Sequence, residues 1–403
     1  MSESKKEHEG AIMSSQNHPH QRTVVERVDD LIATAIVHGA SDIHLEPYAD
    51  FMRVRFRIDG MLVMQPSFAH DIAEQIVARI KILARMNVTI KRVAQDGKFF
   101  VAAGDEKVDI RVATFPTVYG EKVVIRILDR TVHVLSLDQL GMHEHIQANI
   151  LTHVQRMHGL LLVTGPTGSG KTTTLYALLN YLNMPDRHII TLEDPVEYYL
   201  DGIVQSQVHT SAGFTFENGM RSLLRQDPDV IMVGEIRDKQ TARIAIEAAL
   251  TGHLVVSTLH THDAPSAVAR LADMGIEPFL INAALIGVVA QRLARRLCDA
   301  CKITHALSLQ EQELLESWGH TVAAAYNSAG CDNCDGAGTK GRVGIFQWLS
   351  MNEQLRSCIH KNFSLDTLYS SAYQQGMLNL RDDAAVKVKE GIISFAHMLS
   401  LIV

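Results

Sequence analysis

The feature that most constrains the fold is a glycine-rich segment in the middle of the chain: Gly165, Pro166, Thr167, Gly168, Ser169, Gly170, Lys171 and Thr172. It matches the pattern G-x-x-x-x-G-K-[ST], follows the apolar run Leu160–Thr164 and precedes a predicted helix over Thr173–Leu182. A strand, this loop and a helix in that order form a phosphate-binding P-loop. Lys171 is expected to reach the β- and γ-phosphates of a nucleotide, and Thr172 to ligate Mg²⁺. The alternative, a chance glycine-rich turn, is disfavoured by the flanking strand and helix.

Short apolar runs alternate with helical segments on both sides of this loop. The runs are Leu160–Thr164, Ile189–Leu192, Val230–Val233 and Leu254–Thr258. Continuous apolar strands separated by helices indicate a parallel sheet covered on both faces. The sequence therefore predicts an α/β fold for residues 142–403, with a helical C-terminal part over 350–403.

A different pattern precedes this region, and it predicts a smaller α+β domain over residues 21–130. A helical pattern runs from Thr23 to Gly39, and a second one includes Ile72 and Met86. The alternating residues Phe51–Ile58 predict a hairpin whose turn is Asp59-Gly60. Further strands are expected at 98–101, 108–114 and 122–128. Residues 1–20 are expected to be a disordered tail and residues 131–141 a linker.

Composition limits the classes of protein to consider. The chain has 403 residues, 46% of them hydrophobic, with a formal net charge of −7. This balance is that of a globular protein of two or three domains, and it argues against a duplex-DNA binder. The longest apolar stretch, Phe279–Ala290, is too short to cross a membrane and is expected to be a buried helix. Without a secretory signal, the chain is expected in the cytoplasm, with reduced cysteines.

Acidic residues follow two of the predicted strands. Glu193 and Asp194 come at the end of Ile189–Leu192, and Glu235 follows Val230–Val233. The carboxyl ends of parallel strands form the edge where open α/β sheets bind ligands. These carboxylates are therefore candidates for handling Mg²⁺ and the attacking water. The alternative is that they cap helices or pair with Arg237 and Arg243.

Four of the five cysteines form two C-x-x-C pairs, Cys298 with Cys301 and Cys331 with Cys334. Two such pairs are suited to a tetrahedral four-thiolate Zn²⁺ site, and with four protein ligands the site would be structural. We expect this zinc-binding insert over residues 296–345. The alternative is four free or oxidised cysteines. Cys358 is expected to be a small buried side chain, and its role is open.

Several motifs resemble those of the secretion ATPase superfamily. They are Ala40–Pro47, Arg53–Gly60, Thr191–Tyr198, Leu224–Asp229, Gly234–Asp238, Thr251–His253 and Ser257–Thr261. The similarity runs from about residue 24 to the C-terminus. Within the superfamily, the chain is most similar to the type II secretion and type IV pilus assembly ATPases, the GspE/PilB group. The resemblance implies a hexameric ring motor with an N-terminal α+β (PAS-like) regulatory domain and a RecA-like P-loop ATPase core.

The resemblance also implies roles for individual residues. Gly165–Thr172 would be Walker A, Glu193 the water-activating residue of the acidic box, and Glu235 part of an atypical Walker B. His253 and His260 would sense the γ-phosphate or relay its loss. The remaining family positions are basic: Arg111 and Arg126 of the N-terminal domain, which approach the phosphates, and Arg221 and Arg225 before Walker B. The residue pattern alone favours a solvated strand face for Arg111 and Arg126, and satisfied side chains at strand ends for His253 and His260.

The resemblance finally implies partners and a location. The expected protein is a cytoplasmic ATPase that uses Mg²⁺ and ATP and carries Zn²⁺. It would associate peripherally with the inner membrane through a platform or docking protein, without specific nucleic acid. Typical members carry further N-terminal domains that dock onto the membrane partner, so the docking surface here is open. The four-cysteine insert favours assembly or secretion over retraction.

Three alternatives stay open: a retraction or DNA-transfer motor of the same superfamily, a nucleotide-binding scaffold that does not hydrolyse, and a nucleic-acid-binding zinc protein. The joint presence of Lys171, Glu193 and Glu235 disfavours the scaffold, and the net charge disfavours the third.

Overall fold

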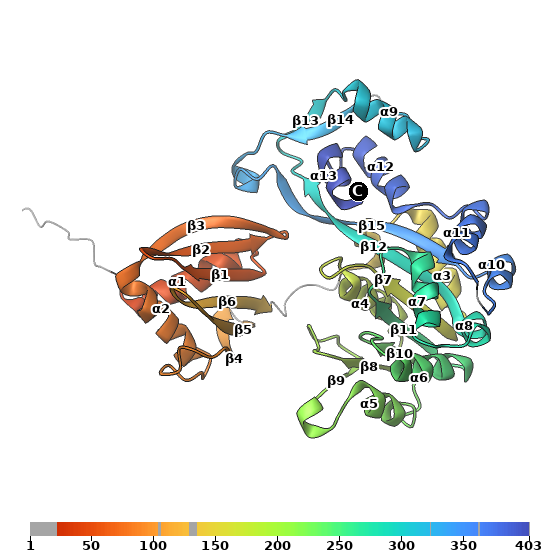
Figure 1. Ribbon diagram of the computed structural model, residues 1–403, viewed down its shortest axis with the longest axis horizontal. Coiled ribbons are helices and arrows are strands. Elements are labelled where there is room, and N and C mark those ends of the chain that lie inside the picture. Colours follow the sequence, from red (N-terminus) through yellow and green to blue (C-terminus); the bar gives the residue numbers. More distant parts are fainter. Residues whose placement is uncertain (1–21, 104–105, 129–134, 323, 362, 403) are drawn as a thin grey trace, which may run out of the picture. The chain divides into compact units, whose positions relative to one another are not determined.

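The computed structural model describes residues 22–103, 106–128, 135–322, 324–361 and 363–402 (Figure 1). The expected disordered tail lies outside the described residues. The chain divides into two compact units, Met1–Ile127 and Leu128–Val403, and each is described by itself. Among the described residues, no helix combines the length and the apolar character that crossing a bilayer requires.

The first unit is an antiparallel sheet with two helices packed together. Its strand order is β3-β2-β1-β6-β5-β4. The bounds are β1 Asp42–Pro47, β2 Phe51–Ile58, β3 Met61–Ala69, β4 Gln95–Ala103, β5 Glu106–Thr117 and β6 Gly120–Leu128, with helices α1 Val24–Val37 and α2 His70–Leu83. Thr23 begins α1 with a capping box to Glu26. The predicted hairpin is confirmed: Asp59 and Gly60 have φ of 47° and 83°, and they connect β2 to β3.

The second unit is built on a seven-stranded sheet with the order β15-β12-β7-β11-β10-β8-β9. The bounds are β7 Gly159–Thr164, β8 Ile189–Glu193, β9 Val204–Gln207, β10 Val230–Val233, β11 Leu254–Leu259, β12 Leu285–Leu297 and β15 Thr339–Ser350. All neighbouring pairs are parallel except β12 with β15. The predicted parallel sheet is therefore confirmed, with an antiparallel strand added at one edge.

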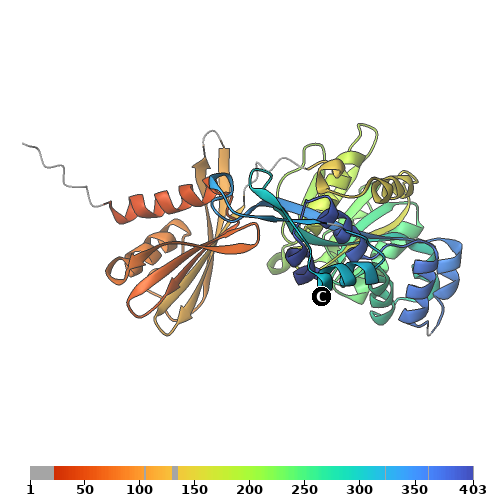
Figure 2. The same cartoon turned by 90° about the horizontal axis from the view of Figure 1, so that it is seen from above.

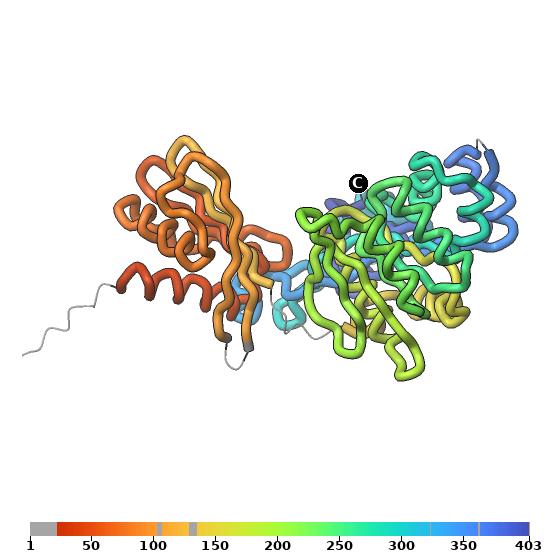
Figure 3. The backbone as a smooth tube through the Cα atoms, turned by 90° about the horizontal axis from the view of Figure 1, so that it is seen from below, coloured from red at the N-terminus to blue at the C-terminus, as the bar shows by residue number. Residues whose placement is uncertain are grey.

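Helices cover both faces of this sheet and form two separate cores. One core includes η1 (Leu137–Leu140), α3 (Glu144–Val154) and α4 (Lys171–Leu182). The other includes α5 (Phe216–Leu223), α6 (Lys239–Leu250), α7 (Ala264–Asp273), α8 (Pro278–Ala284), α10 (Glu353–Cys358) and α11 (Leu365–Gln374). Helix α11 lies beside α7 (Figures 1 and 3), and the Tyr369 hydroxyl donates to Asp263, the N-cap of α7, at 2.6 Å.

The long strands β12 and β15 continue past the end of β7, and side chains on this continued part contribute to a third core. It includes residues of α12 (Leu380–Lys389) and α13 (Phe395–Ile402) together with the segment between the strands. That segment contains β13 (Lys302–His305), α9 (Leu309–Ser317), β14 (Ala325–Ser328) and η3 (Asp332–Cys334). The expected helical C-terminal region is confirmed by α10 to α13 (Figure 2).

Two expectations were wrong. The predicted buried helix over 279–290 ends at Ala284, and strand β12 begins at Leu285. Its β-branched residues pair with β7, and Gly287 gives space to the Trp348 indole, since a Cβ there would lie 2.0 Å from the ring. Of the expected linker, 131–141, residues 131–134 lie outside the described residues, whereas Leu137 and Leu140 belong to η1 and are buried in a core of the second unit.

Candidate active site

The phosphate loop, Gly165–Thr172, joins the end of β7 to the start of α4, at the carboxyl edge of the sheet. Gly168 and Gly170 have φ of 78° and 85°, in the left-handed region that favours glycine. Gly170 is the N-cap of α4, and no side chain caps this helix end. The N–H groups of the first helical turn are therefore free of a side-chain cap, and the helix dipole adds partial positive charge. This is the geometry of an anion site.

Lys171 lies folded over its own loop. Its Nζ donates to the carbonyl oxygens of Gly165 at 2.9 Å and Pro166 at 3.0 Å. Burial lowers the pKa of Lys171, and the negative charge of Glu235 acts in the opposite direction. The ammonium group is thus held at the loop by weak neutral acceptors, which a phosphate oxygen would replace with a stronger charged one.

Glu235 lies just after β10, on the same edge of the sheet. Its carboxylate accepts a hydrogen bond from Arg237, and its Oε2 lies 3.6 Å from Nε2 of His260. His260 directly follows β11, so the two side chains come from the ends of neighbouring strands. The structure therefore brings Lys171, Glu235 and His260 to one edge. The alternative that these carboxylates pair with Arg237 and Arg243 is correct for Arg237, which pairs with Glu235. Arg243 pairs with Glu247 at 2.9 Å.

Glu193 has a different environment, because its carboxylate is enclosed. It is 2% exposed and accepts hydrogen bonds from Tyr176, from Thr191 at 2.5 Å and from Gln205 at 3.2 Å. Burial raises the pKa of Glu193, in opposition to these hydrogen bonds. Of the two acidic residues, Glu235 is the one whose charge acts on Lys171. The geometry favours Glu235 as the group that meets water, and Glu193 as a buried support.

His253 is not brought to the phosphate loop of its own chain. It precedes β11 at the opposite edge of the sheet, where its backbone carbonyl accepts from Gly159 N, at the start of β7. A six-residue strand at about 3.3 Å per residue separates the two edges by roughly 20 Å. Its Nδ1 lies 2.9 Å from the carbonyl oxygen of Ala248. Direct contact between His253 and a phosphate on this loop is thus excluded by strand length.

Three of the four predicted arginines, Arg126, Arg221 and Arg225, are exposed, and Arg111 is half-buried. Arg221 of α5 pairs with Glu217 at 3.3 Å, and Arg225 donates to the carbonyl of Arg221 at 2.8 Å. In the first unit, Arg126 of β6 pairs with Asp42 at 3.0 Å and its side chain is 64% exposed. Arg111 lies on β5 opposite Lys98 of β4. The approach of these guanidinium groups to a phosphate stays a prediction.

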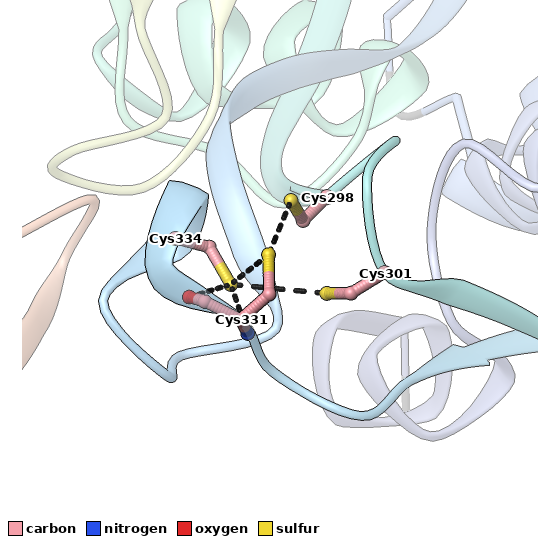
Figure 4. Close-up of side chains that lie close together, drawn as sticks. All are labelled: Cys298, Cys301, Cys331 and Cys334. Atoms are coloured by element: carbon pink, nitrogen blue, oxygen red, sulfur yellow. Dashed lines mark hydrogen bonds between the residues drawn. The ribbon is translucent and has the colours of Figure 1, made fainter.

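Four cysteine sulfurs form a compact cluster between β12 and β15 (Figure 4). The Sγ–Sγ distances are 3.9 Å for Cys298–Cys331 and 3.8 Å for both Cys301–Cys334 and Cys331–Cys334. A tetrahedral Zn²⁺ site with bonds of about 2.3 Å has sulfur–sulfur edges of roughly 3.8 Å. The donor set therefore fits Zn²⁺. Cys358 lies apart on α10, where its Sγ donates to the carbonyl of Gln354 at 3.4 Å.

Backbone N–H groups support these sulfurs. Cys331 N and Gly338 N donate to Cys334 Sγ at 3.3 Å and 3.2 Å. Such donors orient thiolates and offset their negative charge in metal sites. All four ligand positions would be filled by protein, which is the arrangement of a structural site.

Sequence reasoning missed residues that hold the site together. Thr164, the last residue of β7, bonds through Oγ1 to Thr261 Oγ1 at 2.7 Å and accepts from Thr261 N at 2.9 Å. This links the start of the phosphate loop to the segment after β11. The available signal was that Thr164 ends one predicted strand and Thr261 follows another by three residues, but nothing in the local pattern paired them.

The comparison with known families decides the family. The model of the family described as "Type II/IV secretion system protein" matches residues 17–400. The chain belongs to this family. This family member is 46% identical to the type II secretion system protein E of Pseudomonas aeruginosa, over 93% of its own length and 75% of that protein.

One further relative and one solved structure are also similar to the chain. With the type IV pilus assembly ATPase TfpB of Acinetobacter baylyi, the chain is 44% identical over 94% of its length and 65% of that protein. The crystal structure of the pilus retraction motor PilT with bound ADP is similar in fold, with a TM-score of 0.61 and 25% identity over 92% of this chain and 96% of that one. The RecA-like core with an N-terminal α+β domain is thus the fold of this secretion ATPase family.

Proposed function

We propose that this family member hydrolyses ATP with Mg²⁺ and works as a hexameric motor for type II secretion or type IV pilus assembly. The observation that carries the proposal is the single edge of the sheet that holds the phosphate loop, Lys171 and Glu235. The ATPase named among its relatives supports the same reading. Because the pilus retraction motor PilT is similar in fold, a retraction motor is the second candidate function. The four-cysteine cluster, which we associate with assembly and secretion, favours the first.

The chain's own residues supply most of the proposed chemistry. The free N–H groups at the start of α4 bind the phosphates, and Lys171 exchanges its two carbonyl partners for phosphate oxygens. Glu235, oriented by Arg237 and adjacent to His260, orients the attacking water. Mg²⁺, when bound by Thr172 and the phosphates, neutralises charge that develops on the transferred group.

The arginines and the partners belong to the same proposal. Arg111 and Arg126 of the N-terminal unit, together with Arg221 of α5 and Arg225 just after that helix, supply positive charge to a phosphate of their own or a neighbouring chain. His253 acts indirectly, through β11. The four cysteines would hold Zn²⁺, and this bond network would keep the insert folded. The motor lies in the cytoplasm and binds an inner-membrane platform or docking protein.

Steady-state phosphate release from MgATP by the purified full chain tests this function. The matched control is Lys171→Ala, which removes the charge at the phosphates and leaves the glycine loop intact. We expect turnover by the natural chain and background release by the variant. A chain that binds MgATP without releasing phosphate would instead be a nucleotide-binding scaffold.

A pull-down from membranes with the natural chain as bait tests whether it works in a secretion system or in a pilus system. Recovery of a secretion platform or a pilus platform with the natural chain would decide between the two. Recovery of neither, with a retraction phenotype in cells, would favour the second candidate.

A further inference from the structure

We propose that Gln291 is a positioning residue for the phosphate loop, which fixes the Ser169–Gly170 peptide so that the Gly170 N–H points toward the bound phosphates. The inference rests on the proposed nucleotide site. It concerns a residue outside the glycine-rich motif, 122 positions away from Ser169 in the chain.

Gln291 lies on β12 where that strand passes the phosphate loop. Strand β12 pairs with β7 as far as Ala290, which is opposite Thr164. Gln291 is the next residue, so it lies beside the loop that begins at Gly165. On its other side it stays paired with Phe346 of β15, and its backbone is therefore held by the sheet.

Gln291 contacts the loop at both ends. Its side chain is buried, with 2% exposure, and Nε2 donates to the carbonyl oxygen of Ser169 at 2.6 Å. Its backbone oxygen lies 2.4 Å from the point where a Cβ on Gly165 would stand. A Cβ on Gly170 would lie 3.3 Å from Nε2. The two glycines therefore leave the space that Gln291 occupies.

The orientation of the amide is fixed by its partner. A flipped amide would place Oε1 against the carbonyl oxygen of Ser169, and two acceptors repel each other. In the observed orientation Oε1 is buried and has no hydrogen-bond partner among the described residues. A buried unpaired acceptor is unfavourable, and an apolar side chain of similar size would avoid it. Stability alone therefore does not explain a glutamine here, whereas holding Ser169 does.

The bond to Ser169 determines where the next N–H points. In a planar trans peptide, the C=O and the following N–H lie on opposite sides. A carbonyl of Ser169 that is held toward β12 directs the N–H of Gly170 away from β12, into the loop. Convergent backbone N–H groups are what such loops offer to phosphate oxygens. Gln291 thus orients a phosphate donor without touching the phosphate.

The chain offers a matched control on the neighbouring strand. Gln347 of β15 is also 2% exposed, and its Oε1 accepts one hydrogen bond, from Ala264 N at 2.9 Å. This bond holds the start of α7 and does not involve the phosphate loop. Replacing either glutamine by methionine keeps the volume and leaves one backbone group without its partner.

The test compares Gln291→Met with Gln347→Met in the full chain. We expect Gln291→Met to weaken MgATP binding and raise KM by roughly tenfold, with kcat changed less than about threefold, because the N–H acts equally on bound ground and transition states. Gln347→Met should bind MgATP as the natural chain does, at a similar loss of thermal stability. Gln291→Asn, whose amide is too short to reach Ser169, replaces the methionine variant if that one does not fold.

Hydrogen exchange across residues 165–171, measured without nucleotide, gives a readout that does not depend on activity. Faster exchange in Gln291→Met than in Gln347→Met supports the proposal, even if the natural chain binds no MgATP and the proposed function fails. Unchanged MgATP affinity together with unchanged exchange in Gln291→Met overturns it. An equal loss of affinity in Gln347→Met overturns it as well, since general destabilisation would then explain the effect.

Discussion

The Nε2 atom of His260 lies 3.6 Å from Oε2 of Glu235, across the ends of two neighbouring parallel strands. The Glu235 carboxylate is thus held between the Arg237 guanidinium and an imidazole. The His260 side chain is 50% exposed, so it can meet both solvent and ligand, whereas Glu235 is mostly covered. This arrangement makes His260 the residue of the histidine pair that can act directly on the site.

His260→Gln is expected to lower kcat by at least roughly tenfold, about 1.4 kcal/mol in barrier, while MgATP binding changes little. The imidazole lies against the Glu235 carboxylate, and the glutamine amide does not reproduce the position of its Nε2. The measurement is phosphate release at saturating MgATP. His262→Gln, at an exposed neighbouring position, is the control. Equal rates for the His260 variant and the natural chain would remove His260 from the site.

Arg126→Ala is expected to lower turnover strongly without preventing ATP binding. Arginines that balance transition-state charge contribute ~10³–10⁵ in rate when another element supplies them. A fragment that begins near Leu135, and so keeps the buried η1, should behave in the same way. Mixing Arg126→Ala chains with Lys171→Ala chains tests whether the arginine acts between neighbours. In that case mixed rings regain activity; no recovery in mixed rings confirmed by mass would argue against it.

Glu193→Gln is expected to change the pH dependence of stability. The pKa of Glu193 is raised above its ordinary value of 4.5, so the folded chain binds this proton more tightly than the unfolded chain. The Glu193 contribution to the free energy of unfolding therefore falls as pH rises from about 4.5 through the raised pKa, and is smallest above it. Urea unfolding of both proteins across this range should show that slope in the natural chain only. Parallel profiles would contradict the assignment.

Cys331→Ser is expected to remove bound zinc and destabilise the insert, with a smaller effect on nucleotide affinity. Structural zinc contributes on the order of 10–16 kcal/mol to folding in small peptides. Metal analysis of protein purified without chelator should give one zinc per natural chain and one per Cys358→Ser chain, because Cys358 lies outside the cluster. Metal-free natural protein would refute the zinc site.

The sequence made the parallel sheet predictable because its strands are continuous apolar runs and its loop has a fixed pattern. Strand β12 was not predictable in the same way. Residues 279–290 are apolar except for Asn282 and Gly287, and a short apolar run fits a buried helix and a buried strand equally well. The strand is stabilised by its pairing with β7 and by the packing of Trp348 on Gly287. Both are contacts between distant segments of the chain, so the local sequence does not reveal them.

The same limit applies to the site. Glu193 and Glu235 both follow strands in the sequence, and only the fold separates the enclosed carboxylate from the one beside Lys171. His253 and His260 flank one strand, so one of them had to lie at the opposite edge from the loop. Gln291 could not be found from local pattern, because its partner Ser169 is reached only through the register of β12 against β7.

The most direct test of the account is turnover by Glu235→Gln. This change keeps size and removes the charge that orients the attacking water. We expect the variant to bind MgATP about as tightly as the natural chain and to release phosphate ~10²–10⁴-fold more slowly. Phosphate release by Glu235→Gln at the natural rate would contradict it.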